Sequence, residues 1–205
     1  MAVSVREGAV FLDKDGTLVE NIPYNVDPDL IRLVPGAVGG LRALGNAGYR
    51  LVVVSNQSGV ARGLFSIDAL EHLQHRLREL LGDAGITLDG LYFCPHHPDG
   101  SVAEYAFECS CRKPAGGLLL RAARDHGIDL MRSWMIGDIL DDVEAGRRAG
   151  CRTVLIDSGN ETEWVLSRDR MPDHVVRDVG EAAAVIEALD GMTEAGLAGD
   201  LEETR

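Results

Sequence analysis

Short apolar segments alternate along the chain with longer segments whose apolar residues recur at helical spacing. The short segments have the length of β-strands and cover residues 9–12, 51–54, 91–93, 134–136 and 153–156. Strands that alternate with helices are typical of α/β proteins with a parallel sheet and helices on both of its faces. We therefore predict a doubly wound, mostly parallel Rossmann-like sheet.

The segments between these strands have the apolar spacing of amphipathic helices. Pro35 and Gly36 open a segment that places Val38, Leu41 and Leu44 on one face. Ser66 is a predicted helix N-cap, and the helix after it carries leucines at positions 70, 73, 77, 80 and 81, which we assign to the core. Further helices are predicted over 118–126, from about Asp141, and over 181–189.

The composition is that of one globular domain. The chain has 205 residues, of which 45% are hydrophobic and 26% are charged, enough to bury a full core. We assign 1–189 to a single domain. Small and acidic residues dominate 190–205, and we expect a flexible tail there.

Charge and hydropathy exclude several classes of partner. The formal net charge of −13 opposes binding to nucleic acids or anionic membranes, which usually requires clustered Lys and Arg. The sequence contains neither an apolar run of about 20 residues, as a membrane span needs, nor a secretory signal pattern. We expect a cytoplasmic, monomeric protein whose anionic substrate binds in a local cationic pocket.

Two carboxylates follow the first predicted strand, in the run Phe11-Leu12-Asp13-Lys14-Asp15-Gly16-Thr17. Ligands of α/β sheets bind at the carboxyl ends of the strands, and a period of two directs Asp13 and Asp15 to the same side. One can attack phosphorus while the other moves a proton. A polar turn at the strand end is the alternative interpretation.

Three later segments place complementary groups at the ends of strands or before helices. Ser55 follows the second strand, Lys113 precedes a helix, and Asp138 ends the run Met135-Ile136-Gly137-Asp138. A carboxylate nucleophile repels a phosphate dianion, so Mg²⁺ and a lysine are needed to neutralise the charge. We predict that Asp13 and Asp138 supply metal oxygens and that Lys113 supplies the cation. Asp141 is interpreted as a charge that complements a helix dipole, and this interpretation is also open for Asp142.

Three of the four cysteines lie in one predicted loop. Cys94, His96, Cys109 and Cys111 form a Cys₃His set over 94–111 that can close a tetrahedral structural zinc site, whereas Cys151 stands apart. Such a site would fix the backbone that delivers Arg112 and Lys113. Unpaired loop cysteines are the alternative.

These segments, in this order, resemble the haloacid dehalogenase (HAD) superfamily of phosphotransferases, and the resemblance covers nearly the whole chain. It implies that Asp13 is the nucleophile and that Asp15 is the general acid/base and a Mg²⁺ ligand through its backbone carbonyl. It further implies that Ser55 and Lys113 stabilise the phosphoryl group and that Asp138 binds Mg²⁺.

Within that superfamily the chain resembles the D-glycero-D-manno-heptose 1,7-bisphosphate 7-phosphatases, which are related to histidinol-phosphate phosphatases. The runs that carry the likeness are FLDKDGT, VVVSNQSGVARG, DGLYFCPHHPDGSV, CSCRKP and MIGD. The resemblance implies a compact phosphatase domain without a large cap domain and with the Cys₃His zinc loop. It also implies a small phosphorylated sugar as substrate and removal of its 7-phosphate. It implies substrate contacts from Asn21, Ile22, Pro23, Tyr24, Ser55, Asn56, Gln57, Ser58, Arg112 and Lys113, and Arg62 is a further candidate.

Two departures from the family pattern bear on the substrate. Ile139 stands where the heptose enzymes carry a substrate-contacting lysine, and the loop from Asn21 to Tyr24 lacks their more polar, glycine-containing character. Hydrolysis of histidinol phosphate or another small sugar phosphate is therefore the alternative function. A non-catalytic zinc-containing binding module is disfavoured, because Asp13, Asp15, Lys113 and Asp138 are all present.

Overall fold

A six-stranded parallel sheet forms the centre of the computed structural model, which describes residues 7–202, with side chains described through Gly191. The strand order is β3-β2-β1-β4-β5-β6, the order of a Rossmann fold. The strands are β1 (Ala9–Leu12), β2 (Arg50–Asn56), β3 (Gly90–Cys94), β4 (Trp134–Gly137), β5 (Arg152–Ile156) and β6 (His174–Val176). The predicted fold class is thus confirmed. The sequence reasoning missed β6, a strand of only three residues.

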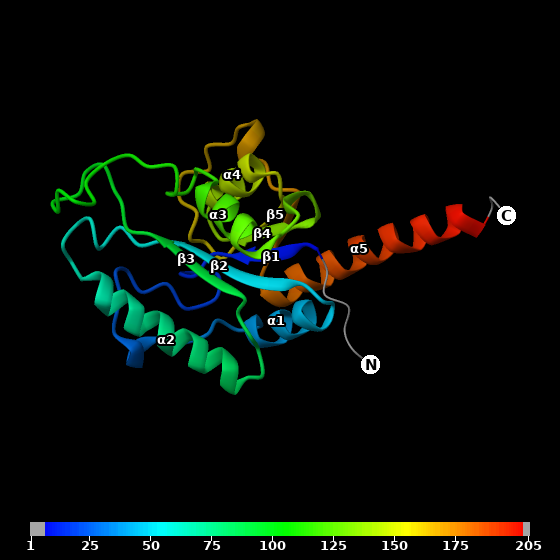
Figure 1. The fold of residues 1–205 in the computed structure, drawn as a ribbon, viewed down its shortest axis with the longest axis horizontal. Coiled ribbons are helices and arrows are strands. Elements are labelled where there is room, and N and C mark those ends of the chain that lie inside the picture. The colour runs from blue at the N-terminus through cyan, green and yellow to red at the C-terminus, as the bar shows by residue number, and fades with distance from the viewer. Residues whose placement is uncertain (1–6, 203–205) are drawn as a thin grey trace.

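Helices cover both faces of this sheet (Figure 1). They are α1 (Ala37–Asn46), α2 (Ile67–Asp83), α3 (Gly117–His126), α4 (Leu140–Ala149) and α5 (Val179–Glu202). Short 3₁₀ turns lie at Pro28–Leu30, Leu130–Arg132 and Arg168–Arg170. Among the helices of the described residues, none combines the length and the apolar character needed to cross a membrane.

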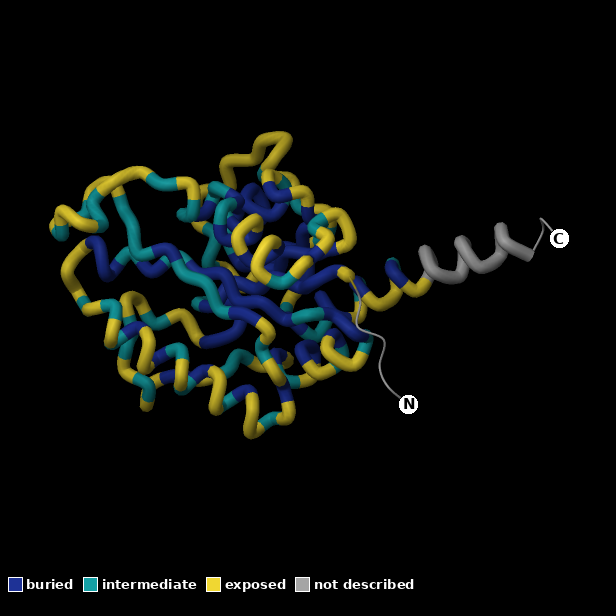
Figure 2. Tube along the Cα trace, viewed as in Figure 1, coloured by how far each residue is buried: buried dark blue, intermediate teal, exposed yellow. Residues whose placement is uncertain are grey.

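The central strand β1 is apolar on both faces, as a doubly covered strand should be. Val10 and Leu12 pack with α1, α2 and α5, while Ala9 and Phe11 pack with α3 and α4. These four residues are fully buried, and Figure 2 shows the buried strands as the dark interior of the molecule. The period of two continues past the strand and sets the direction of the polar residues that follow.

The helix after Ser66 forms as predicted. The Ser66 hydroxyl accepts a hydrogen bond from the Ala69 amide at 3.2 Å, which caps the start of α2. Leucines 70, 73, 77 and 81 are buried, and Leu80 is half-buried against the same core.

The last helix runs well beyond the predicted end. It continues from Val179 to Glu202 instead of stopping near Leu189, because Ala, Leu, Glu and Met favour helix even where little surface is buried. Asp190 is buried and accepts hydrogen bonds from the Tyr49 hydroxyl and, at 2.5 Å, from Arg152. The folded domain therefore includes at least Asp190. Flexibility of the later tail remains a prediction, and residues 203–205 lie outside the described part.

Adjacent leucines in α3 allow a matched test of this packing. Leu119 is fully buried against the sheet, whereas the side chain of Leu120 is 47% exposed. We expect Leu119→Ala to lower the free energy of unfolding by about 2–5 kcal/mol, because it opens a cavity in the core. Leu120→Ala should change it by less than about 1 kcal/mol. Urea unfolding would measure both, and equal losses would contradict the assignment of α3's buried face.

Candidate active site

The carboxyl end of the sheet gathers the polar residues that follow β1, β2 and β4 with Lys113, which precedes α3. Asp13 continues the line of β1, and its backbone amide donates to the Ile136 carbonyl of β4 at 2.9 Å. Gly16 then turns the chain with a φ of 88°. A Cβ atom at Gly16 would lie 2.1 Å from an oxygen of Asp138, so this turn requires glycine for both its conformation and its space.

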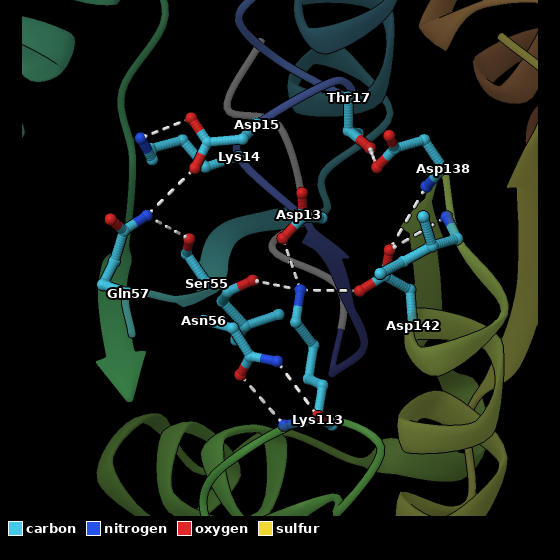
Figure 3. A network of polar contacts seen from close by, with 12 residues as sticks. Asp13, Lys14, Asp15, Thr17, Ser55, Asn56, Gln57, Lys113, Asp138 and Asp142 are labelled. Atoms are coloured by element: carbon cyan, nitrogen blue, oxygen red, sulfur yellow. Dashed lines mark hydrogen bonds and ion pairs between the residues drawn. The ribbon is translucent and has the colours of Figure 1, made fainter. Parts of the chain in front are cut away.

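The buried ammonium group of Lys113 lies at the centre of the site (Figure 3). It donates to Asp13 Oδ1 and to the Val54 carbonyl at 3.0 Å, and it forms an ion pair with Asp142 Oδ1 at 2.6 Å. Burial lowers the pKa of Lys113, but the two carboxylates outweigh burial and raise it above its ordinary value. Lys113 is therefore a permanent cation in direct contact with the predicted nucleophile.

Asn56 at the end of β2 fixes the backbone of this lysine. Its amide nitrogen donates to the Lys113 carbonyl at 3.0 Å, and its amide oxygen accepts from the Lys113 backbone N–H at 3.0 Å (Figure 3). These two hydrogen bonds fix the position of the Lys113 backbone, and so of the side chain that it carries. The structure thus gives Asn56, predicted as a substrate contact, a structural contact with Lys113.

Asp138 and Asp142 follow β4, and their carboxylates lie close to that of Asp13. Asp138 Oδ1 accepts from the Thr17 hydroxyl at 3.1 Å, and its Oδ2 accepts from Asn160 at 2.8 Å. Asp142 is fully buried, and its Oδ2 accepts the backbone N–H groups of Asp138 and Ile139 at 3.2 and 3.3 Å.

The interpretation of Asp142 as a helix N-terminal charge was incomplete. Asp142 does bond to the amides at the start of α4, but its other oxygen faces Lys113. Thr17 and Asn160 were also missed as partners of Asp138. Thr17 could have been suspected from its place after Gly16, whereas nothing in the sequence around Asn160 indicated its contact.

The three carboxylates of Asp13, Asp138 and Asp142 have oxygens within 4.8 Å of one another. Burial, only partly opposed by Lys113, raises the pKa of Asp13 above its ordinary value. Burial and the nearby Asp142 carboxylate raise the pKa of Asp138 to about 6. One lysine cannot balance three carboxylates, and oxygen ligands of this kind suit Mg²⁺. The residues therefore fit a divalent cation between Asp13 and Asp138.

The carboxylate of Asp15 is turned away from this cluster. Its Oδ1 accepts from Lys14 at 2.6 Å, and its Oδ2 accepts from the side-chain amide of Gln57 at 3.0 Å. The same Gln57 amide also donates to the Ser55 hydroxyl at 2.8 Å. The side chain of Asp15 is thus held apart from the metal-ligand set. Its predicted contact with Mg²⁺ involves the backbone carbonyl and remains a prediction.

A cleft of about 290 Å³ opens beside Asp15. Its lining includes Asp15 and most of the predicted substrate contacts, namely Asn21, Ile22, Pro23, Tyr24, Asn56, Gln57 and Ser58. Tyr24 has a φ of 57°, uncommon for a residue other than glycine, and its side chain is half exposed at this cleft. Polar amides and one aromatic ring give the cleft the character of a site for a small polar ligand.

Arg62 and Arg112 lie outside the lining of this cleft, next to His97. Arg62 Nη2 lies 3.1 Å from His97 Nε2. Burial and the positive charges of Arg112 and Arg62 lower the pKa of His97. Among the described residues, Arg112 has a buried guanidinium nitrogen without a hydrogen-bond partner. Both guanidinium groups thus lie close enough to His97 to affect its pKa, and Arg112 directly precedes Lys113 in the sequence.

The four predicted zinc ligands converge at the end of β3. The sulfur atoms of Cys94, Cys109 and Cys111 lie 3.2–3.5 Å apart, and His96 Nδ1 lies 3.3 Å from Cys111 Sγ and 3.5 Å from Cys94 Sγ. Four ligands around one zinc would be separated by about 3.5–3.8 Å. The set therefore fits a closed structural zinc site.

This cluster is coupled to the catalytic side of the sheet. Cys94 pairs with Asn56 in the register of β2 and β3, and the Cys94 carbonyl accepts from the backbone N–H of Gln57 at 2.8 Å. Cys111 directly precedes Arg112 and Lys113. A metal at this position would hold both segments that place Lys113.

Comparisons with known proteins agree with this arrangement. Residues 110–182 match a family model described as HAD-hydrolase-like. The chain is 41% identical over 168 residues to D-glycero-beta-D-manno-heptose-1,7-bisphosphate 7-phosphatase of Yersinia pestis, which covers 78% of this chain and 89% of that protein. It is 42% identical over 177 residues to the enzyme of that name from Escherichia coli strain K12, covering 82% and 91%.

A solved structure shares the fold and most of its length. The D,D-heptose 1,7-bisphosphate phosphatase of B. bronchiseptica, complexed with magnesium and phosphate, superimposes with a TM-score of 0.72 at 28% identity. The match covers 87% of this chain and 97% of that one.

We predict one tightly bound zinc per chain, held by Cys94, His96, Cys109 and Cys111. Elemental analysis of protein purified without added metal should find it. Cys109→Ser should lose most of the zinc and much of the activity, because the loop before Lys113 is released. Cys151→Ser, outside the cluster, should keep both. A zinc-free protein with full activity would show that the cluster plays no part in placing Lys113.

Proposed function

The chain belongs to the D-glycero-D-manno-heptose-1,7-bisphosphate 7-phosphatase family of HAD-type phosphatases, and we propose that it removes the 7-phosphate of this sugar through an aspartyl-phosphate. The observation that carries the proposal is the contact of the Asp13 carboxylate with the buried Lys113 ammonium. Such a pair places a nucleophile where the charge of a phosphoryl group is already compensated.

In the first step an Asp13 oxygen attacks the phosphorus atom, and the bond from phosphorus to the sugar oxygen breaks. Asp15 gives a proton to the departing sugar oxygen. Lys14 and Gln57 hold the two oxygens of Asp15 at 2.6 and 3.0 Å, so this carboxyl group is already placed beside the cleft. The products of the step are the free sugar hydroxyl and phosphorylated Asp13.

In the second step Asp15, now deprotonated, takes a proton from a water molecule that attacks the phosphorus of phosphorylated Asp13. The bond between phosphorus and the Asp13 oxygen breaks, which releases inorganic phosphate and restores the carboxylate. Lys113 and the Ser55 hydroxyl are the groups proposed to stabilise the phosphoryl oxygens. Asp13 and Asp138 would hold Mg²⁺, which offsets the negative charge of the phosphoryl group.

The sugar would lie in the cleft formed by the Asn21–Tyr24 loop and Gln57–Ser58. We propose that Arg112 binds the sugar or its distal phosphate, with Arg62 as a further cation. The support for Arg112 is its buried, unpaired nitrogen beside the backbone of Lys113. A planar guanidinium binds a phosphate through two donors, whereas Lys113 is proposed to contact the reacting phosphoryl group.

We expect Asp13→Asn to lower turnover by at least about a hundredfold, roughly 2.7 kcal/mol of lost barrier reduction, because an amide cannot form the aspartyl-phosphate. Phosphate release with Mg²⁺ would measure it, and circular dichroism would check the fold. Asp157→Asn, at the exposed end of β5, is the matched control and should remain fully active. Retention of more than about a hundredth of the rate in Asp13→Asn would exclude covalent catalysis by Asp13.

We also expect kcat/KM for the heptose bisphosphate to exceed that for histidinol phosphate by at least about tenfold, or roughly 1.4 kcal/mol. Histidinol phosphate has no second anion for Arg112 to bind. Ile139 works against this preference, because it replaces the lysine with which the resembling heptose enzymes contact their substrate. Arg112→Ala should reduce the preference, whereas Arg124→Ala on α3 should leave it unchanged.

Phosphate release with Mg²⁺ would measure kcat/KM for both heptose bisphosphate anomers, histidinol phosphate and fructose 1,6-bisphosphate. Equal or higher efficiency on histidinol phosphate would overturn the heptose assignment in favour of the alternative substrate. An unchanged preference in Arg112→Ala would show that the distal group is bound elsewhere.

A further inference from the structure

The loop after β5 brings Asn160 to the active site from outside all of the segments that the sequence singled out. Gly159 has a φ of 84°, which lets the chain reverse after Ser158. Asn160 then points back toward β4, and its side-chain nitrogen donates to Asp138 Oδ2 at 2.8 Å and to the Ser158 hydroxyl at 3.0 Å. The contact joins residues that lie 22 positions apart in the sequence.

Asn160 and Thr17 hold the Asp138 carboxylate from its two ends. Thr17 donates to Oδ1 at 3.1 Å, and Thr17 is fully buried. A Cβ atom on Gly16 would lie 2.5 Å from the Asn160 nitrogen and 2.1 Å from Asp138 Oδ2, so the three residues are in close contact. With both oxygens engaged, the Asp138 carboxylate has little freedom to rotate.

Hydrogen bonds and ion pairs connect the loop that carries Asn160 to α4. Glu161 Oε2 accepts the backbone N–H of Leu140 at 2.6 Å, in the first turn of that helix. Further along, Arg170 forms ion pairs with Asp141 at 3.2 Å and with Glu144 at 3.7 Å. Because α4 also carries Asp142, this loop and the acidic cluster are positioned by the same helix.

The chemical nature of these donors matters as much as their position. A lysine or arginine at the site of Asn160 would neutralise Asp138 and compete with a cation for it. The neutral amide and hydroxyl orient the carboxylate and leave its negative charge available, which is what a metal ligand requires.

From these contacts we propose that Asn160 is a positioning residue that orients the Asp138 carboxylate for the divalent cation of the phosphatase site. The proposal rests on the proposed function only in taking Asp138 as a metal ligand. Partners of metal ligands typically contribute tenfold to a hundredfold in metal affinity. Asn160→Ala should therefore weaken metal binding by about tenfold or more, while turnover at saturating Mg²⁺ should stay within about threefold.

The test measures metal binding directly, without substrate. Mn²⁺ binding to the zinc-loaded full chain would be followed by electron paramagnetic resonance, and Mg²⁺ binding by calorimetry. Asn160→Leu, which nearly keeps the shape of asparagine but lacks the donor, should bind the ions as weakly as Asn160→Ala. Thr162→Ala, an exposed position of the same loop, should bind them like the unchanged protein.

Three outcomes would overturn the proposal: ion affinities of both Asn160 variants within about twofold of the unchanged protein, normal affinity in Asn160→Leu alone, or an equal loss in Thr162→Ala. Thermal melting would confirm that each variant is folded. Failure of the heptose preference with weakened ion binding in both Asn160 variants would leave this inference standing, because the readout involves no sugar.

Discussion

The buried ammonium group of Lys113 sets the requirements that the rest of the structure meets. A charge removed from water is tolerated only where opposite charges and hydrogen-bond acceptors surround it. Asp13, Asp142 and the Val54 carbonyl provide them. Asp13 directly follows β1, Asp142 lies in α4, and Val54 lies in β2. The central place of β1 between β2 and β4 allows these groups to meet at one edge of the sheet.

Each charged group is then held by a neutral partner that leaves its charge in place. Asn56 holds the backbone of Lys113, backbone amides hold Asp142, and Thr17 and Asn160 hold Asp138. Gln57 has a similar part at Asp15, although Lys14 contributes a charge there. The excess of carboxylates over cations thus remains available for a metal and for phosphoryl chemistry. The Cys₃His set ends directly before the segment that carries the lysine.

Much of the fold was predictable because it follows from local patterns. The five longer strands appear as short apolar runs, and the helix after Ser66 appears as a capping residue followed by leucines at helical spacing. Strand β6 was missed because three residues are too few to show a period. The last helix was placed too short because the prediction weighed how much surface its residues could bury and neglected their intrinsic helix propensity.

The sequence by itself determined the residue types of the site: the DxDGT segment, the lysine before α3, the aspartate after β4 and the Cys₃His set. Their placement at strand ends was enough to predict that Asp13, Lys113 and Asp138 converge. Only the tertiary structure decided that Asp142 pairs with Lys113 and that Asn160 bonds to Asp138. These contacts join distant parts of the chain, and hydrophobic periodicity does not encode the partner of a polar side chain, which depends on how the strands and loops pack in three dimensions.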